Sequence, residues 1–314
     1  EGAAAETQYG GGDVLHLDPI VGRASREGAD GLYISGKVKQ LVDGVDRLVH
    51  QRPASVQSPR AAPAALVVVL LCAKPLHIGV GEGNAAEAAG IEMVVCMASS
   101  VPAVREGSTR LFVTAAIDFG GAVTLDELLA TAFEALGAGA DAVITARRLD
   151  AVRLLAAESV PVMGHLGFVP KKSTQYGGVR AVGNTAAEAL DLWRQFRELE
   201  EAGAFAVECE LIPAAVLAEI TPRTSMATIS LGSGPEADVM FLFQSDVVGS
   251  SERIPRHARA YGDVASLQGQ VAAERVRALA AFRADVQGGG FPTDAEVSRI
   301  DLDELKKFRV GLGD

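Results

Sequence analysis

The chain has 314 residues, 48% of them hydrophobic, and a formal net charge of −11 at pH 7. This length and composition can bury a large core in one or two domains, while the acidic balance argues against an electrostatic nucleic-acid binder. Three widely spaced cysteines without a CxxC pair argue against a disulfide framework or a zinc cluster, and they favour a reducing, cytoplasmic compartment.

Residues 1–75 differ in composition from the rest of the chain. The stretches "TQYGGGD" and "HQRPASVQSPRAAPAA" are loop-like, and "GKVKQLVDGVDRLVH" between them places its apolar residues at helical spacing. We expect a partly irregular N-terminal extension with one helix, suited to covering the remaining domain or to oligomer contacts. The apolar run at 61–75 is shorter than the roughly 20 residues of a membrane-spanning helix, which favours a buried strand or helix end and no membrane association.

From residue 76 onward, short apolar runs alternate with alanine-rich helical stretches. The eight expected strands are 76–80, 93–97, 111–117, 141–146, 160–166, 205–211, 227–232 and 246–249. Near-continuous apolar strands that alternate with helices indicate a parallel sheet covered on both faces. Eight such strands, with no GxGxxG after the first, predict an α/β fold of the (β/α)8 TIM barrel type over residues 76–314 rather than an open dinucleotide-binding sheet.

Two of the expected helices have clear boundaries. "TLDELLATAFEALGAGA" begins at a threonine cap with acidic residues in its first turn and ends at glycine. "NTAAEALDLWRQFRELEEAGA" places Leu192, Phe196 and Leu199 on one face and stops at Gly203. Both patterns predict helices that pack one apolar face against the barrel.

In a barrel of this kind, chemistry is carried by the loops at the carboxyl ends of the strands. Strand six would end at Glu208 and Glu210, and we expect only one of these two glutamates to face inward, with Glu210 favoured. A partly desolvated carboxylate has a raised pKa and can act as a general base near neutral pH. The alternative is a salt-bridged or solvent-facing acid.

His165 stands at the end of strand five in "GHLG", between glycines that allow the backbone and a ligand to approach closely. An imidazole there can donate to a substrate oxygen or carry a proton, although a purely structural histidine is the alternative. The remaining strand ends supply further polar or glycine candidates. They are Ser99, Asp118, Gly232, Ser233 and Asp246. Cys209 has no apparent catalytic partner, so we expect it to serve packing.

Three segments together resemble a known family. "VPVMGHLGFVPKKSTQYGGVRAVGN", "AVECELIPAAVLAEIT" and "ISLGSGPEADVMFLFQSDVVG" are similar to motifs of ketopantoate hydroxymethyltransferases, in which a glutamate stands three residues before a proline, as Glu210 stands before Pro213. The match spans residues 76–314. It is most specific from residue 141 onward.

The resemblance implies a barrel of the phosphoenolpyruvate mutase and isocitrate lyase superfamily, assembled as a homo-oligomer. Such enzymes bind Mg²⁺ and transfer a one-carbon unit from methylene-tetrahydrofolate to C3 of 2-oxoisovalerate, a small 2-oxo acid, through an enolate. On this resemblance Glu210 is the base and His165 lies beside the substrate. Ser99, Asp118, Gly232 and Ser233 are then expected substrate contacts.

The chain departs from the family where the metal is expected. The positions of the two metal-binding aspartates are Ala98 and Ala116, and the lysine and glutamate of strand four fall at Ile144 and Ala146. Asp118 is the remaining candidate metal ligand, if the end of its strand is remodelled. Mg²⁺ binding in the family's manner is therefore not expected.

Three hypotheses follow from the sequence. The first is an enzyme that makes or breaks a C–C bond beside a 2-oxo acid with altered metal use or substrate. The second is a barrel that has lost catalysis and acts as a binding or structural subunit. The third is a metal-independent lyase or hydrolase that uses Glu210, His165 and Asp118. Retention of the glutamate and the histidine favours catalysis, whereas loss of the polar groups on strands two to four favours the second hypothesis. Of the three, we expect the transferase-like enzyme.

Overall fold

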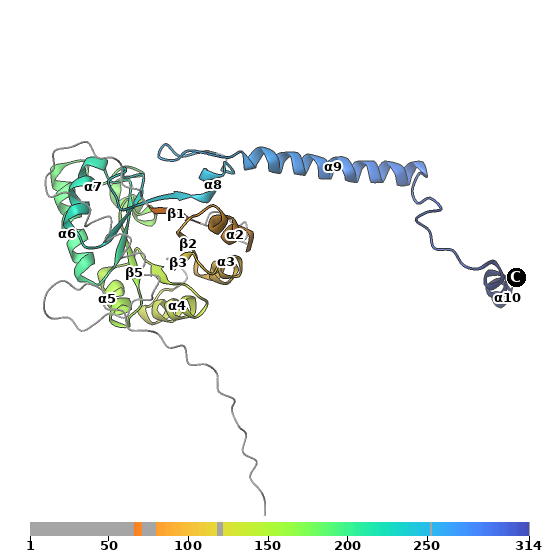
Figure 1. Ribbon diagram of the computed structural model, residues 1–314, viewed down its shortest axis with the longest axis horizontal. Helices are drawn as coiled ribbons and strands as arrows, with labels where there is room; N and C mark the ends of the chain where they lie inside the picture. The colour runs from red at the N-terminus through yellow and green to blue at the C-terminus, as the bar shows by residue number, and fades with distance from the viewer. Residues whose placement is uncertain (1–65, 71–79, 118–121, 252, 314) are drawn as a thin grey trace, which may run out of the picture. The chain divides into compact units, whose positions relative to one another are not determined.

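The strands of the protein form a closed barrel. The computed structural model describes residues 66–70, 80–117, 122–251 and 253–313. The strands are β1 (Leu66–Leu70), β2 (Met93–Met97), β3 (Phe112–Ala116), β4 (Ala142–Ile144), β5 (Val162–Gly167), β6 (Ala206–Glu210), β7 (Ala227–Leu231) and β8 (Val239–Phe243). All pairings are parallel and follow chain order, and β1 pairs with both β2 and β8. The predicted (β/α)8 barrel is confirmed (Figure 1).

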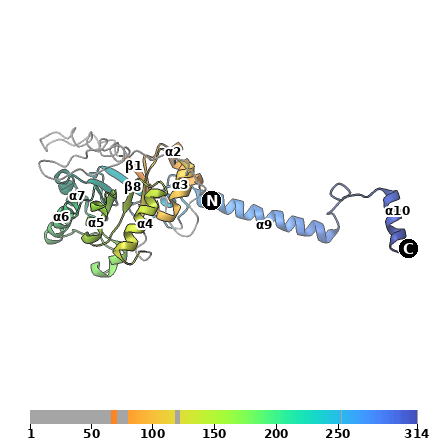
Figure 2. The same ribbon diagram turned by 90° about the horizontal axis from the view of Figure 1, so that it is seen from below.

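Helices connect the strands and surround them, as Figure 2 shows for α2 to α7. The α-helices are α2 (Val80–Ala88), α3 (Val101–Gly107), α4 (Leu125–Gly137), α5 (Leu149–Ala157), α6 (Ala186–Glu201), α7 (Ala214–Ile220), α8 (Gln244–Val247), α9 (Val264–Gly288) and α10 (Leu302–Gly311). The described part of the chain also contains the short 3-10 helices η1 (Ala98–Ser100), η2 (Pro170–Tyr176) and η3 (Thr221–Arg223). Parallel strands need such crossovers, which cover the outer face of the sheet.

Two predicted helices form as expected. At the start of α4, Thr124 accepts a hydrogen bond from the Glu127 backbone, and the Glu127 side chain accepts one from the Thr124 backbone, which completes a capping box. In α6, Leu192, Phe196 and Leu199 are the buried residues. They pack into the apolar layer between the strands and the helices.

Successive residues on a strand alternate between two apolar layers. On β6, Val207 and Cys209 belong to the layer between strands and helices. Ala206, two positions from Glu208, belongs to the layer inside the barrel, together with Met163 of β5. Period-two alternation therefore directs the side chains of Glu208 and Glu210 to the same inner side as Ala206.

Two strand predictions are wrong. The first strand was expected at 76–80, but β1 is "LVVVL" at Leu66–Leu70, and Val80 begins α2, while 71–79 lie outside the described residues. The last strand was expected at 246–249, but the continuous apolar run "VMFLF" forms β8 and Asp246 lies in α8. Strands of a parallel sheet often read as continuous apolar runs without polar alternation, so the length of the apolar run was the better signal in both places.

A second compact unit consists of Val248–Arg253 and Ala260–Asp314. Its helix α9 begins where the Asp263 side chain accepts a hydrogen bond from the Ser266 backbone and ends at Gly289, which has φ +71. Residues 1–65 of the predicted extension, with its helix, lie outside the described residues, as does the boundary at residue 75, whereas Leu66–Leu70 from that range form β1. The domain division stays a prediction. Within the described residues, no helix has both the length and the apolar character to cross a membrane.

Candidate functional site

Three polar side chains meet inside the barrel at the ends of β5 and β6. Nε2 of His165 lies 3.1 Å from Oε2 of Glu210 and 3.9 Å from Oε1 of Glu208. One ligand atom from each of the three residues lies within 4.8 Å of the other two. The expectation that only one glutamate faces inward is therefore wrong, because positions 208 and 210 are two residues apart and share a face.

Glycines bring the two strands together at this point. A Cβ added to Gly167, which has φ +85, would lie 2.2 Å from the backbone oxygen of Glu210. That oxygen accepts a hydrogen bond of 2.8 Å from the Phe168 backbone. Gly164 faces the other way, where an added Cβ would lie 2.3 Å from the Leu199 side chain of α6. The "GHLG" sequence thus allows close packing on both sides of the histidine.

Burial and charge act on the three groups in opposite directions. Burial alone lowers the pKa of His165, but the carboxylates of Glu208 and Glu210 outweigh it, so the pKa of this imidazole is raised. Burial raises the pKa of Glu208, and the charge of Glu210 raises it further, while His165 acts against both. The three groups therefore form an acid–base cluster in which each pKa depends on the charges of its neighbours.

Gly232 and Ser233, the substrate contacts expected just after β7, lie in surroundings that differ from those of the His165 cluster. Ser233 is fully buried; its hydroxyl donates to the Cys209 carbonyl at 2.7 Å and accepts from the Ile212 backbone at 2.8 Å. Gly232 has φ +70, and an added Cβ would lie 2.9 Å from Leu211 and 3.0 Å from His257. Both residues hold the end of β7 against its neighbours. Their contact with a substrate stays a prediction.

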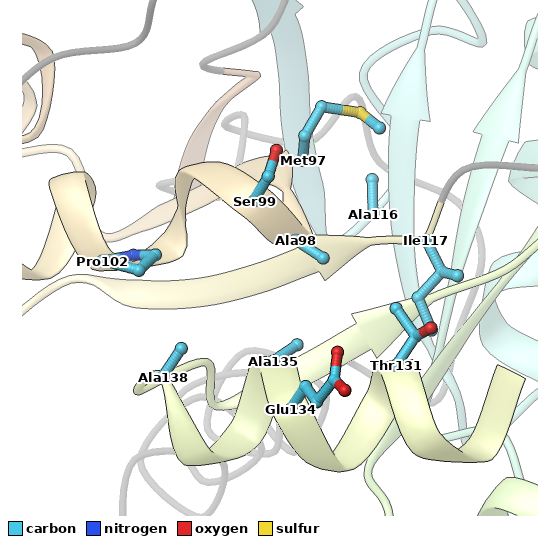
Figure 3. A pocket seen from close by; sticks show the side chains of 10 residues that line it. All are labelled: Met97, Ala98, Ser99, Pro102, Ala116, Ile117, Thr131, Glu134, Ala135 and Ala138. Atoms are coloured by element: carbon cyan, nitrogen blue, oxygen red, sulfur yellow. The ribbon is translucent and has the colours of Figure 1, made fainter. Parts of the chain in front are cut away.

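A separate cavity of about 400 Å³ opens at the ends of β2 and β3, beside α4. Ser99 lies on its wall, and the carboxylate of Glu134 reaches toward it from α4 (Figure 3). Most of the other lining residues are apolar. They are Met97, Ala98, Pro102, Ala116, Ile117, Ala135 and Ala138, with Thr131 as a further polar group. Asp118, expected to bind substrate or metal, lies outside the described residues.

The ends of β2, β3 and β4 do not fit the family's magnesium. Mg²⁺ prefers oxygen ligands in near-octahedral geometry. The positions that the resemblance assigns to charged residues are Ala98, Ala116, Ile144 and Ala146, and none of these side chains carries an oxygen. Among the described residues of these strands, the family's carboxylate ligands are therefore missing.

One member of the cluster, Glu208, was not predicted to face the barrel interior. Glu208 is 7% exposed, lies on the same inner face as Glu210, and completes the cluster around His165. The signal was present in "ECE", because a strand with period two presents both glutamates to one side. Cys209, between them, faces the opposite layer and is fully buried, in agreement with its expected packing role.

Comparison with known proteins gives a consistent result. The family model described as ketopantoate hydroxymethyltransferase matches residues 79–294. The 3-methyl-2-oxobutanoate hydroxymethyltransferase of Thermococcus kodakarensis is 34% identical over 213 residues, which are 66% of this chain and 72% of that protein. The enzyme of the same name from Roseiflexus sp. is 34% identical over 222 residues, covering 69% of this chain and 77% of that protein.

Among solved structures, the barrel is similar to 2,3-dimethylmalate lyase, described as a member of the PEP mutase/isocitrate lyase superfamily. The TM-score is 0.46 at 12% identity, and the match covers 88% of this chain and 99% of that one. The extent of the family model and the identity to its named members decide the assignment. This chain belongs to the ketopantoate hydroxymethyltransferase family.

Proposed function

We propose that this chain is an enzyme that forms or breaks a C–C bond at C3 of a small 2-oxo acid, such as 2-oxoisovalerate, through an enolate. The observation that carries the proposal is the contact of 3.1 Å between Nε2 of His165 and Oε2 of Glu210 inside the barrel. Family membership supports the reaction class. The position of the pair at the carboxyl ends of β5 and β6 agrees with where barrels of this kind place their chemistry.

In the proposed reaction, the Glu210 carboxylate removes the proton from C3, and the electron pair of that C–H bond moves toward the carbonyl to give the enolate. Water releases formaldehyde from methylene-tetrahydrofolate, the proposed one-carbon donor, and leaves tetrahydrofolate. The enolate carbon then bonds to the formaldehyde carbon, and the electron pair of the C=O π bond moves onto its oxygen. The oxygen of the new hydroxymethyl group takes up a proton. His165 touches the base, so it can orient the carboxylate and share the proton that the carboxylate has accepted.

Proton removal can be tested without knowing the one-carbon donor. The purified chain is incubated with 2-oxoisovalerate in D2O, and the loss of the C3 proton signal is followed by NMR. We expect exchange by the wild type and a loss of about 10²–10⁴-fold in Glu210→Gln, which keeps the size but removes the base. The control is Glu134→Gln, which alters the carboxylate beside the other cavity and should exchange at the wild-type rate.

Two results would contradict the proposal. Absence of exchange in the wild type under all donor conditions would leave the barrel as a binding or structural subunit. Exchange that persists in Glu210→Gln but is lost in Glu134→Gln would show that the base lies beside the cavity at the ends of β2 and β3 instead of at Glu210.

A further inference from the structure

Glu208 is a buried carboxylate that faces His165 and Glu210 inside the barrel. The residue is 7% exposed, and its Oε1 lies 3.9 Å from Nε2 of His165, too far for a hydrogen bond. Among the described residues, no group donates a hydrogen bond to its oxygens. A buried ionised carboxylate without donors is costly, so such a group normally carries a proton or binds a cation.

The surroundings of Glu208 favour a cation. One oxygen from Glu208, one from Glu210 and one nitrogen of His165 lie within 4.8 Å of one another, a spacing at which one ion can contact all three. The side chains come from adjacent, paired strands, in which His165 is opposite Glu208 and Gly167 is opposite Glu210. Ligands on paired strands of a barrel are held more rigidly than ligands on loops.

The negative charge of the cluster also favours a bound cation. Two carboxylates facing one imidazole give a site that is negative or at most neutral, depending on how many protons it holds. A 2-oxo acid is itself an anion, and it enters such a site more readily if a dication is present. Three protein ligands also leave positions open on the ion for the carboxylate and carbonyl oxygens of such a substrate.

We propose that His165, Glu208 and Glu210 bind one divalent transition-metal cation. The imidazole nitrogen in the donor set favours Mn²⁺, Co²⁺ or Zn²⁺ over Mg²⁺, which prefers oxygen ligands alone. This site lies on β5 and β6, whereas the family's magnesium is expected on β2 to β4. It goes beyond the proposed function, which needs only Glu210 and His165. The Glu210 carboxylate has two oxygens, so one can contact the ion while the other faces the substrate.

The test is direct titration of the full chain, freed of metal with a chelator, using MnCl2, CoCl2 and MgCl2 in separate calorimetric experiments. We expect one Mn²⁺ or Co²⁺ per chain and weaker binding of Mg²⁺. Glu208→Gln keeps the size of the side chain and removes a charged ligand, so its affinity for Mn²⁺ and Co²⁺ should fall by at least about 10–100-fold, the loss reported even for outer-shell partners of metal ligands.

Two controls make the result specific. Glu201→Gln makes the same chemical change at an exposed residue of α6, and this variant should bind Mn²⁺ like the wild type. His165→Gln removes the only nitrogen ligand, so it should lose affinity for Co²⁺ more than for Mg²⁺. If circular dichroism shows that Glu208→Gln does not fold, the His165→Gln variant tests the cation site in its place.

The proposal is overturned if the wild type binds neither Mn²⁺ nor Co²⁺ at concentrations up to about 1 mM, the weak end of specific affinities. Unchanged affinity in a folded Glu208→Gln, or in His165→Gln, would also overturn it. These outcomes are separate from those of the isotope-exchange assay. Metal binding without exchange contradicts the proposed function alone, and exchange without metal binding contradicts the cation site alone.

Discussion

The two halves of the barrel mouth differ in chemistry although they share one architecture. At the ends of β5 and β6, a histidine and two glutamates lie within 4.8 Å of one another. At the ends of β2 and β3, small and apolar side chains such as Ala98 and Ala116 line a cavity of about 400 Å³. The barrel holds both sets of strand ends in place, so a family member can change the polar groups on one half and keep those on the other.

The largest expected effect is on the rate of proton exchange and tests the β5–β6 half. The His165→Gln variant keeps a hydrogen-bonding side chain near Glu210, but a glutamine amide cannot take up a proton near neutral pH. We predict that exchange at C3 of 2-oxoisovalerate falls by about 10²-fold or more, the range for loss of a proton-transferring group. NMR in D2O measures the rate. A rate within a factor of two of the wild type would show that this half of the mouth does not handle the proton.

The next effect compares one serine from each half. Ser233→Ala leaves the Ile212 N–H and the Cys209 carbonyl without their buried partner, which should reduce the free energy of unfolding by about 1–3 kcal/mol. Ser99→Ala, at an exposed position beside the cavity, should change it by less than about 0.5 kcal/mol. Urea denaturation monitored by circular dichroism measures both. Equal effects would contradict the structural role assigned to Ser233.

A smaller effect concerns the packing that supports His165. Gly164→Ala places a Cβ about where the Leu199 side chain now lies, and because that side chain can partly turn aside, we expect a loss of about 1 kcal/mol of unfolding free energy. Gly137→Ala, in α4 with nothing within 4 Å of an added Cβ, should instead stabilise by about 0.5–1 kcal/mol. The opposite signs are the prediction, and denaturant unfolding checks them. A neutral Gly164→Ala would mean that α6 does not press on this strand.

The smallest expected effect concerns the Cys209 thiol, which should not react with an alkylating reagent in the folded chain. Burial raises the pKa of the Cys209 thiol, which lies between the two inward glutamates but faces the helices. We predict that iodoacetamide at pH 8 leaves this thiol unmodified in the folded chain and modifies it in urea, as peptide mass spectrometry can record. The unfolded thiol ionises near pH 8.5, so this burial makes folding less favourable as the pH rises above that value. Rapid labelling of the native chain would place Cys209 on the wrong face.

Much of the fold could be predicted because its signals are local. The cap at Thr124, the apolar face of α6 and the apolar runs of β2 to β7 all lie within short stretches of sequence. The first and last strands were misplaced because parallel strands such as β1 and β8 read as continuous apolar runs without polar alternation. Nothing local marks such runs as strands rather than parts of a buried helix.

The candidate site was predicted in part. His165 and Glu210 were recognised from their positions at strand ends, and the structure brings them into contact. Glu208 was excluded by an error about which residues of a strand share a face. The internal partners of Ser233 could not be foreseen, because the Cys209 carbonyl and the Ile212 N–H depend on how β6 and β7 pack together.

The most direct test of the account is a crystal structure of the chain with 2-oxoisovalerate bound. The substrate is expected to lie inside the barrel at the ends of β5 and β6, with C3 in reach of the Glu210 carboxylate and His165 alongside. Density for the substrate in the cavity between Ser99 and Glu134, with the β5–β6 cluster untouched, would contradict the account.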